Sequence, residues 1–286
     1  MSDSTNKHGL PRSIPPEVKQ QLRQEAGFGC VKCGIGIAHY EHIDPEFKDA
    51  KTHDPEKMAY LCARCHGNVT RGFWSKDMVW EAKAQPFCIK NGHCHEAFDI
   101  GSTQISLIIG NTELVGVDHI LLVNGKRLLS ILPPETESGP YRISGLFYDS
   151  RGSLVFTIEE NEWKGRPDLW DITCEGGLIV IKTDPKNIAL QIRCNQNRSL
   201  TIEKLDMFFD GVRWCVSDGI LTFEYRGYRE TISGYRLSTD GRNGTAFIFD
   251  NGIVEMGKAG ENSVNLGPRP GQDNISIISN TRFPHG

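Results

Sequence analysis

Two Cys-x-x-Cys pairs constrain this chain of 286 residues more than any other feature of its sequence. Cys30 pairs with Cys33, and after 28 intervening residues Cys62 pairs with Cys65. Each pair can form a tight knuckle that supplies two thiolates, and two knuckles complete a tetrahedral zinc site. The sequence therefore predicts one structural Zn²⁺ that holds together a small N-terminal unit.

The stretch between the two cysteine pairs contains HYEHIDPEF, residues 39–47. Glu41 and His42 stand near the end of a predicted strand that Pro45 closes, and His66 directly follows the second pair. Strict alternation would point Glu41 and His42 to opposite faces, so we expect the strand to end or twist there. One carboxylate and two imidazoles beside a zinc site suit metal-assisted hydrolysis, in which two groups hold a cation and the third activates water.

Helix and loop signals dominate the chain before about residue 86. Paired prolines, an apolar face and a terminal glycine predict a first helix, and Ser75 is a suitable N-cap for a later one. The expected helices cover 15–27, a segment from about 62 or 63 onward, and 75–86, with short strands near 37–43 and 58–62.

The sequence pattern changes after about residue 100, from helix and loop signals to short apolar runs that alternate with turn signals. Asn124-Gly125 between two such runs predicts a β-hairpin. Regular strands with closely spaced turns are typical of a β-sandwich or a barrel, and recurring turn-plus-strand units without a fixed period leave a β-solenoid open. The predicted class is α+β, with a small zinc-bound domain followed by a larger all-β domain.

The predicted domain boundaries follow these changes in sequence pattern. A group of cysteines and histidines, Cys88, His93, Cys94 and His95, lies in the expected linker; a second metal there is an alternative to ordinary linker residues, but the spacing matches no standard site. The expected parts are a flexible N-terminus (1–14), the zinc-bound domain (15–86), a linker (87–101), the all-β domain (102–256) and a poorly ordered tail (257–286).

Charge and hydropathy exclude several classes of protein. The net charge of −4 argues against coating nucleic acid by bulk charge, although residues 1–90 carry 13 Lys and Arg against 11 Asp and Glu. No apolar run reaches the roughly 18–20 residues of a membrane span, and the N-terminus lacks the apolar core of a secretory signal. We therefore expect a cytoplasmic protein with no membrane partner.

The segment GFGCVKCGIGIAHYEHIDPEF…LCARCHGNVTRG resembles the HNH endonucleases, the ββα-metal nucleases, in the form that carries a structural zinc. The pattern is a first cysteine pair, an acidic residue followed by His, and a second pair ending in Cys-His; it covers about residues 24–85. The resemblance implies that His42 is the general base and that Glu41 and His66 bind a catalytic Mg²⁺ or Mn²⁺.

Two positions depart from the pattern of that family. The resemblance implies an Asn nine residues before His66, where this chain has Lys57, and often a His four residues after it, where the chain has Thr70. His53 is the nearest chemically sensible substitute for the Asn, and the alternative is a solvated loop histidine.

Basic residues near the predicted helix are candidates for contacts with DNA phosphates, with ordinary solvated charge as the alternative. They are Arg64, Arg71 and Lys76. His39 is expected on the strand surface, and Phe73 and Trp74 are expected to pack between helices.

The predicted function is a metal-dependent endonuclease that hydrolyses phosphodiester bonds in DNA. By resemblance, proteins that pair such a unit with an accessory domain are often restriction or phage-defence effectors. The acidic all-β domain is expected to bind a target, a partner protein or copies of itself. A different class remains open: a non-catalytic zinc module that binds nucleic acid or protein and carries a decayed site. A toxin held in check by a partner is a third possibility.

Overall fold

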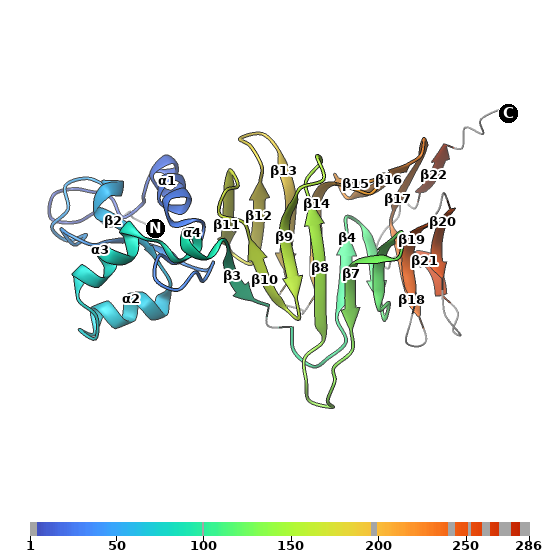
Figure 1. The fold of residues 1–286 in the computed structure, drawn as a ribbon, viewed down its shortest axis with the longest axis horizontal. Coiled ribbons are helices and arrows are strands. Elements are labelled where there is room, and N and C mark those ends of the chain that lie inside the picture. Colours follow the sequence, from blue (N-terminus) through green and yellow to red (C-terminus); the bar gives the residue numbers. More distant parts are fainter. Residues whose placement is uncertain are drawn as a thin grey trace. The chain divides into compact units, whose positions relative to one another are not determined.

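The computed structural model describes residues 5–98, 100–195, 199–239, 244–250, 253–258, 264–268 and 276–280. The chain forms two compact units: the first combines Met1–Glu96 with Lys164–Glu175, and the second combines Ala97–Trp163 with Gly176–Gly286. Figure 1 shows the four helices in the N-terminal part of the chain and strands through the rest. Strands thus dominate a fold that also holds a helical, cysteine-rich unit.

The first unit carries a β-hairpin and a helix in ββα order. Its elements are α1 (Pro16–Ala26), β1 (His39–His42), the 3₁₀ turn η1 (Pro55–Lys57), β2 (Met58–Leu61), α2 (Ala63–Thr70), α3 (Lys76–Ala84), α4 (Phe87–Asn91), β3 (Cys94–Ala97) and β11 (Asp171–Glu175). β1 and β2 are antiparallel, with Glu41 opposite Ala59 and His42 opposite Met58. Helix α2 follows β2 directly, so the hairpin and the helix are fixed close to one another.

Local sequence signals set the ends of these helices as predicted. Helix α1 begins after Pro15, and it ends at Gly27, whose φ of 68° is the left-handed conformation that glycine adopts without strain. Ser75 caps α3 by accepting a hydrogen bond from the Met78 N–H, and Cys62 caps α2 through its sulfur.

A buried core holds the hairpin against the helices of the first unit. Its apolar members come from α1, the first knuckle, the hairpin, α2 and α3, and they include Ala26, Val31, Ile43, Tyr60, Leu61, Val79 and Ala82. The four paired cysteines lie in or against the same cluster. So small a unit buries little apolar surface. A metal bound by these cysteines would therefore contribute a large share of its stability.

A buried ion pair joins α1 to the segment 164–175. Arg23 donates two hydrogen bonds to the Asp171 carboxylate, at 2.9 and 2.6 Å, and a third to the Tyr40 hydroxyl at 2.5 Å. Both charged side chains are only 8% exposed. Burial opposes the charge, but the bonds and charges of Asp171 and Tyr40 raise the pKa of Arg23 above its usual value. The domain boundary predicted near residue 86 therefore missed a segment that completes the first unit.

We expect Asp171→Ala to lower the free energy of unfolding of the first unit by about 3–5 kcal/mol, because it leaves the Arg23 guanidinium buried without its counter-ion. Asp206→Ala is the matched control: Asp206 pairs with Arg213 in the second unit, and these side chains are 35% and 48% exposed. That change should cost at most about 1 kcal/mol. Urea titrations measure both, and equal losses would contradict the structural role of Asp171.

The second unit contains two β-sheets. Its strands are β4 (Ser106–Ile109), β5 (Thr112–Val115), β6 (His119–Val123), β7 (Lys126–Leu132), β8 (Arg142–Tyr148), β9 (Leu154–Glu159), β10 (Glu162–Gly165), β12 (Leu178–Lys182), β13 (Ile188–Cys194), β14 (Leu200–Phe209), β15 (Val212–Ser217), β16 (Ile220–Tyr225), β17 (Tyr228–Ser233), β18 (Tyr235–Thr239), β19 (Thr245–Asp250), β20 (Ile253–Lys258), β21 (Val264–Pro268) and β22 (Ser276–Asn280). One sheet has the order β20-β19-β6-β7-β8-β9-β10, and the other β21-β18-β5-β4-β14-β15-β16-β17-β22, from which β13 and β12 branch at β14.

Aromatic side chains join the two sheets face to face. Trp214 on β15 packs against Phe247 and Phe249 of β19, with ring centroids 5.1 and 5.7 Å apart. Phe223 on β16 lies 5.1 Å from Phe249. Of the three architectures that the sequence left open, this packing is that of a sandwich. The hairpin predicted at Asn124-Gly125 is confirmed: both residues have positive φ, and they connect the antiparallel strands β6 and β7.

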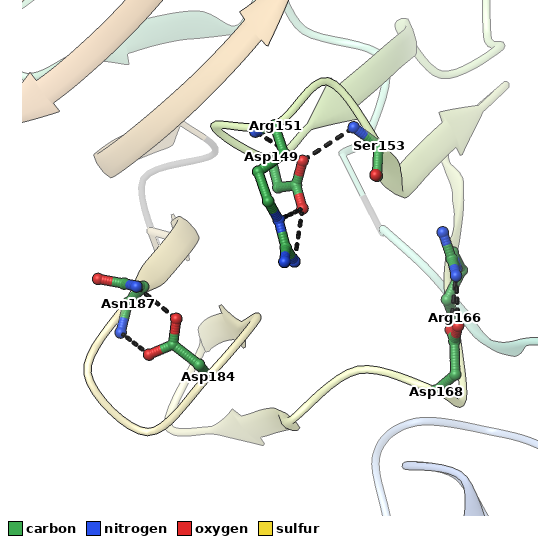
Figure 2. A network of polar contacts seen from close by, with 7 residues as sticks. All are labelled: Asp149, Arg151, Ser153, Arg166, Asp168, Asp184 and Asn187. Carbon is green, nitrogen blue, oxygen red and sulfur yellow. Dashed lines mark hydrogen bonds and ion pairs between the residues drawn. The ribbon is translucent and has the colours of Figure 1, made fainter.

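Aspartates fix two of the turns in the second unit (Figure 2). The buried Asp149 carboxylate accepts hydrogen bonds from the backbone N–H groups of Arg151 and Ser153, at 2.9 and 2.8 Å, in the β8–β9 turn. Asp184 accepts from the Lys186 and Asn187 N–H groups, at 2.9 and 3.0 Å, in the β12–β13 turn. Such side-chain bonds replace backbone partners that a tight turn lacks.

The ends of the chain and the linker differ from the prediction. Residues 5–12, predicted to be flexible, form hydrogen bonds with other residues of the first unit. The predicted linker 87–101 contains the helix α4 and the strand β3. Within the predicted tail, β21 pairs with β18 and β22 pairs with β17. The tail residues 259–263, 269–275 and 281–286 lie outside the described residues.

Candidate metal centre and catalytic cavity

The two cysteine pairs converge on one point in the first unit. The sulfurs of Cys30, Cys33, Cys62 and Cys65 all lie within 4.8 Å of one another. Cys33 Sγ is 3.6 Å from Cys62 Sγ and 3.6 Å from Cys65 Sγ. Four sulfurs held about 2.3 Å from one zinc ion stand about 3.8 Å apart, so the cluster has the size of a tetrahedral zinc site. The donor set and its spacing therefore fit Zn²⁺.

The backbone of the two knuckles prepares the thiols for a metal. The Cys30 N–H donates to the Ile35 carbonyl at 2.8 Å, and the Cys65 N–H approaches Cys62 Sγ at 3.5 Å. A hydrogen bond from Cys33 lowers the pKa of Cys30 to about 5, whereas burial raises the pKa of Cys65 to about 12. A cation is the partner that lets four crowded thiols ionise together.

Only this cluster, within the described part of the chain, brings three or more His, Cys, Asp or Glu side chains within reach of one metal. The alternative site in the linker does not form, because its cysteine thiols face different backbone carbonyls: Cys88 faces Gly34 and Cys94 faces Gly165. His95 instead contacts the Cys33 carbonyl through Nε2 at 3.1 Å, so it supports the first knuckle.

A cavity of about 450 Å³ opens between β1, the loop that joins β1 to β2, and the helices α2 and α3. Its lining includes the three residues predicted to form the site, Glu41, His42 and His66, together with Glu46, Phe47, Thr70, Trp74 and Lys76. The strand β1 ends at His42, so Glu41 and His42 reach the same cavity despite their alternation along the strand.

Glu41 and His66 contact each other across this cavity. His66 Nε2 lies 3.3 Å from Glu41 Oε2, and the two side chains are 43% and 31% exposed. Thr70 Oγ1 donates to the His66 carbonyl at 3.1 Å and lies 3.5 Å from His66 Nε2. One carboxylate oxygen and one imidazole nitrogen are suitable ligands for a divalent cation, with water completing the coordination. Because the pair supplies only two ligands, water or substrate oxygens must fill the remaining coordination positions.

The His42 ring lines the cavity, and its Nε2 is buried without a hydrogen-bond partner in the described residues. No bond to a neighbour ties a hydrogen to this nitrogen, so it can carry the lone pair of a neutral imidazole. Burial lowers the pKa of His42 below its usual value, and the neighbouring His53 lowers it further. A neutral imidazole with a free lone pair is the form that a general base requires.

Lys57 and His53, the two residues considered for the position of the Asn in the HNH pattern, have different surroundings. Lys57 is exposed and pairs with Asp54 at 3.4 Å, so its side chain does not take the place of an Asn at the cavity. His53 is half-buried, and its ring centroid lies 5.2 Å from that of His42. The sequence left open whether His53 was solvated or part of the site, and the structure places it against His42.

The predicted phosphate contacts divide into two groups. Lys76 lines the cavity, where it lies 3.2 Å from Asp44 and 3.3 Å from Glu46. Arg64 and Arg71 are exposed and do not belong to the described lining of the cavity. Arg64 precedes His66 by two residues, which is about 200° around a helix. Neither arginine therefore shares the described cavity lining with Lys76.

The expectation that Phe73 packs between helices is wrong. Its backbone N–H donates to the Asn68 carbonyl at 2.9 Å, and the side chain is 76% exposed. The Trp74 N–H donates to the same carbonyl at 3.2 Å, and the Trp74 side chain lines the cavity. The Lys32 ammonium lies 5.6 Å from the centroid of its ring. The tight turn after α2 thus separates two adjacent aromatic side chains, which helical spacing alone does not reveal.

Sequence reasoning missed Glu46, Phe47 and Trp74 as parts of the cavity. Glu46 and Phe47 are the last two residues of the HYEHIDPEF stretch, so their nearness to His42 in sequence was the available signal. No helix in the ranges that the structure describes is long and apolar enough to cross a membrane.

Comparison with known proteins gave no match: no family model, no curated protein and no solved structure is significantly similar to this chain.

Proposed function

We propose that this chain is a metal-dependent endonuclease that hydrolyses phosphodiester bonds in DNA. The observation that carries the proposal is the shared cavity of Glu41, His42 and His66 beside the four-cysteine cluster. A carboxylate and an imidazole in contact offer ligands to a cation, and a second imidazole with a free Nε2 offers a base. The HNH resemblance, stated above on the sequence, agrees with these roles.

Each side chain then has a separate task. Glu41 and His66 would hold Mg²⁺ or Mn²⁺, which when bound polarises the scissile phosphate and stabilises the departing oxygen. The His42 imidazole accepts a proton from the attacking water, and its contacts with the rings of Phe47 and His53 keep it oriented. Lys76 at the cavity wall supplies positive charge near the substrate. Its ion pairs with Asp44 and Glu46 partly neutralise that charge.

The zinc site has a structural task in this proposal. Its four thiolates leave no open position for water, which is the arrangement of structural rather than catalytic zinc. By fixing the residues before β1 and the start of α2, it holds Glu41 and His66 in place. The β-sandwich is proposed to bind a target, a partner protein or a second copy of the chain.

A non-catalytic zinc module is the second candidate, and two observations favour it. Lys57 places no group in the cavity, and His66 Nε2 already contacts Glu41. A decayed site of this kind would still bind zinc and could still bind nucleic acid.

The two candidates differ in their response to added metal. The protein for this test retains its structural zinc and has been freed of other divalent cations. We expect its rate of nicking a supercoiled plasmid to rise as Mn²⁺ is added. Glu41→Ala and His66→Ala should each need more Mn²⁺ and approach wild-type cleavage only at high concentration, because each variant loses one ligand. The measurement is the Mn²⁺ concentration at half-maximal nicking. Unchanged metal requirements in both variants would contradict the assigned ligands, and no nicking by wild type would favour the non-catalytic module.

A further inference from the structure

An N-terminal arm, residues 5–12, folds back on itself in the first unit. Thr5 and Pro11 form an antiparallel bridge, and the Asn6 N–H donates to the Leu10 carbonyl at 2.9 Å. Asn6 Oδ1 accepts two further hydrogen bonds from backbone N–H groups of the same turn, at 2.9 and 3.0 Å. The Asn6 side chain is therefore fixed in one orientation.

The other end of the Asn6 amide binds the loop that follows β1. Asn6 Nδ2 donates to the Phe47 carbonyl at 2.5 Å and to the Ala50 carbonyl at 2.7 Å. Both amide hydrogens are thus used on one loop, while Oδ1 is used within the arm. The Arg12 guanidinium lies 4.9 Å above the Phe47 ring, which adds a cation–π contact. The arm is therefore attached to the loop by the two Asn6 hydrogen bonds and by the contact between Arg12 and Phe47, a residue that lines the cavity.

The arm also determines which nitrogen of His53 carries the proton. His53 Nε2 lies 2.9 Å from the Pro11 carbonyl, and a carbonyl can only accept, so Nε2 carries the hydrogen. His53 Nδ1 then holds a lone pair; it is buried and finds no hydrogen-bond partner in the part of the chain described.

The His53 ring in turn fixes the position of His42. It stacks on Phe47, with centroids 6.3 Å apart and planes 11° apart. Both rings contact His42, at centroid distances of 5.6 Å for Phe47 and 5.2 Å for His53. The path from the arm to the proposed base consists of contacts between three adjacent rings.

We infer that the N-terminal arm is a positioning element of the catalytic centre: Asn6 and the Pro11 carbonyl hold Phe47 and His53, whose rings together hold the His42 ring in its place at the cavity. The inference rests on the proposed function for its catalytic part. It assigns a role to a segment that lies outside the cysteine pairs and outside the HNH-like stretch of the sequence. A chain whose arm is detached is folded and zinc-bound but cleaves slowly.

Substitutions at Asn6 separate the arm's own fold from its attachment to the loop. Asn6→Asp keeps the acceptor that closes the arm and removes both donors to the loop, whereas Asn6→Ala removes all four bonds. We expect kcat for oligonucleotide cleavage to fall about 10- to 100-fold in both variants, with KM changed by less than about twofold, because a misplaced base affects the chemical step. His8→Ala is the control, since His8 is an exposed residue of the same arm.

A second readout needs no catalysis. Nitrogen-15 NMR of the histidine rings in the full-length protein should show His53 protonated at Nε2 in wild type and as a mixture of tautomers in Asn6→Asp. Zinc content and the unfolding midpoint should remain those of wild type. Unchanged kcat in Asn6→Asp would overturn the inference, as would an unchanged His53 tautomer. Loss of zinc or unfolding of the first unit would also overturn it, because the arm would then be a stabilising element only.

Failure of the inference is distinguishable from failure of the proposed function. A wild-type protein that cuts no DNA with either cation would refute the nuclease and the catalytic part of the inference. The NMR comparison would still decide whether Asn6 and Pro11 set the state of His53. A wild type that cuts DNA and an Asn6→Asp variant that cuts equally fast would refute the inference alone.

Discussion

Replacing Cys62 with serine is expected to remove zinc from the protein and unfold its first unit. Cys62 is one of the four thiols in the cluster, and it also caps α2 by accepting from the Cys65 N–H. Serine is itself a good N-cap, so the substitution removes the metal ligand and retains the cap. Structural zinc sites of this size contribute roughly 10–16 kcal/mol at neutral pH. A whole domain is stable by only about 5–15 kcal/mol, so we expect the unit to unfold.

Elemental analysis and limited proteolysis measure this outcome. Wild type should contain about one zinc per chain, and Cys62→Ser close to none, with rapid cleavage confined to the first unit. The strand signal of the second unit in circular dichroism should remain. Cys215→Ser is the control, because Cys215 lies on β15 in the second unit, away from the cluster. Folded, zinc-free wild type would contradict the account of the metal.

Replacing His42 with alanine is expected to reduce DNA cleavage by roughly two to four orders of magnitude, the loss typical of removing a general base. His42 lines the cavity, its Nε2 has no hydrogen-bond partner in the described residues, and burial lowers its pKa. It lies outside the set of four zinc-binding cysteines, so zinc content should not change. Single-turnover cleavage of a labelled duplex at saturating protein measures the chemical step without interference from binding.

His39→Ala is the matched control for His42→Ala. His39 occupies the same strand, is exposed, and is separate from the described residues that line the cavity. Its removal should leave the rate within about twofold of wild type, as expected for a surface substitution that contacts no reacting group. A comparable loss in both variants would point to damage of the hairpin rather than to a missing base.

Much of the first unit could be predicted from the sequence because its signals are local. The two knuckles need only the spacing of Cys30, Cys33, Cys62 and Cys65, and the clustering of their sulfurs agrees with that spacing. The ends of α1 and α3 followed from Gly27 and Ser75, whose effects act within one helical turn.

The remaining parts depend on contacts between residues distant in the sequence. Arg23 and Asp171 are 148 positions apart, and nothing in the local pattern around either residue indicates the other. Asn6 likewise binds carbonyls 41 and 44 residues away. Backbone carbonyls carry no sequence signature, so contacts made to them cannot be predicted from residue types. For this reason the domain boundaries and the N-terminal arm emerged only from the structure.

The candidate site shows the same division. Glu41, His42 and His66 were predicted from their neighbours in the chain, and the structure places all three on one cavity. The position of His53 depends on how the loop folds, and no periodicity describes that loop. Arg64 and Arg71 were chosen for charge and nearness in sequence, and the rotation of α2 turns Arg64 away from His66.

Plasmid cleavage by wild type and His42→Ala in parallel, with Mg²⁺ or Mn²⁺ and with EDTA, tests the central claim most directly. The account predicts nicked and linear plasmid with wild type in either cation, none with EDTA, and almost none with His42→Ala at equal zinc content. Equal cleavage by the two proteins, or cleavage by neither in either cation, would contradict it.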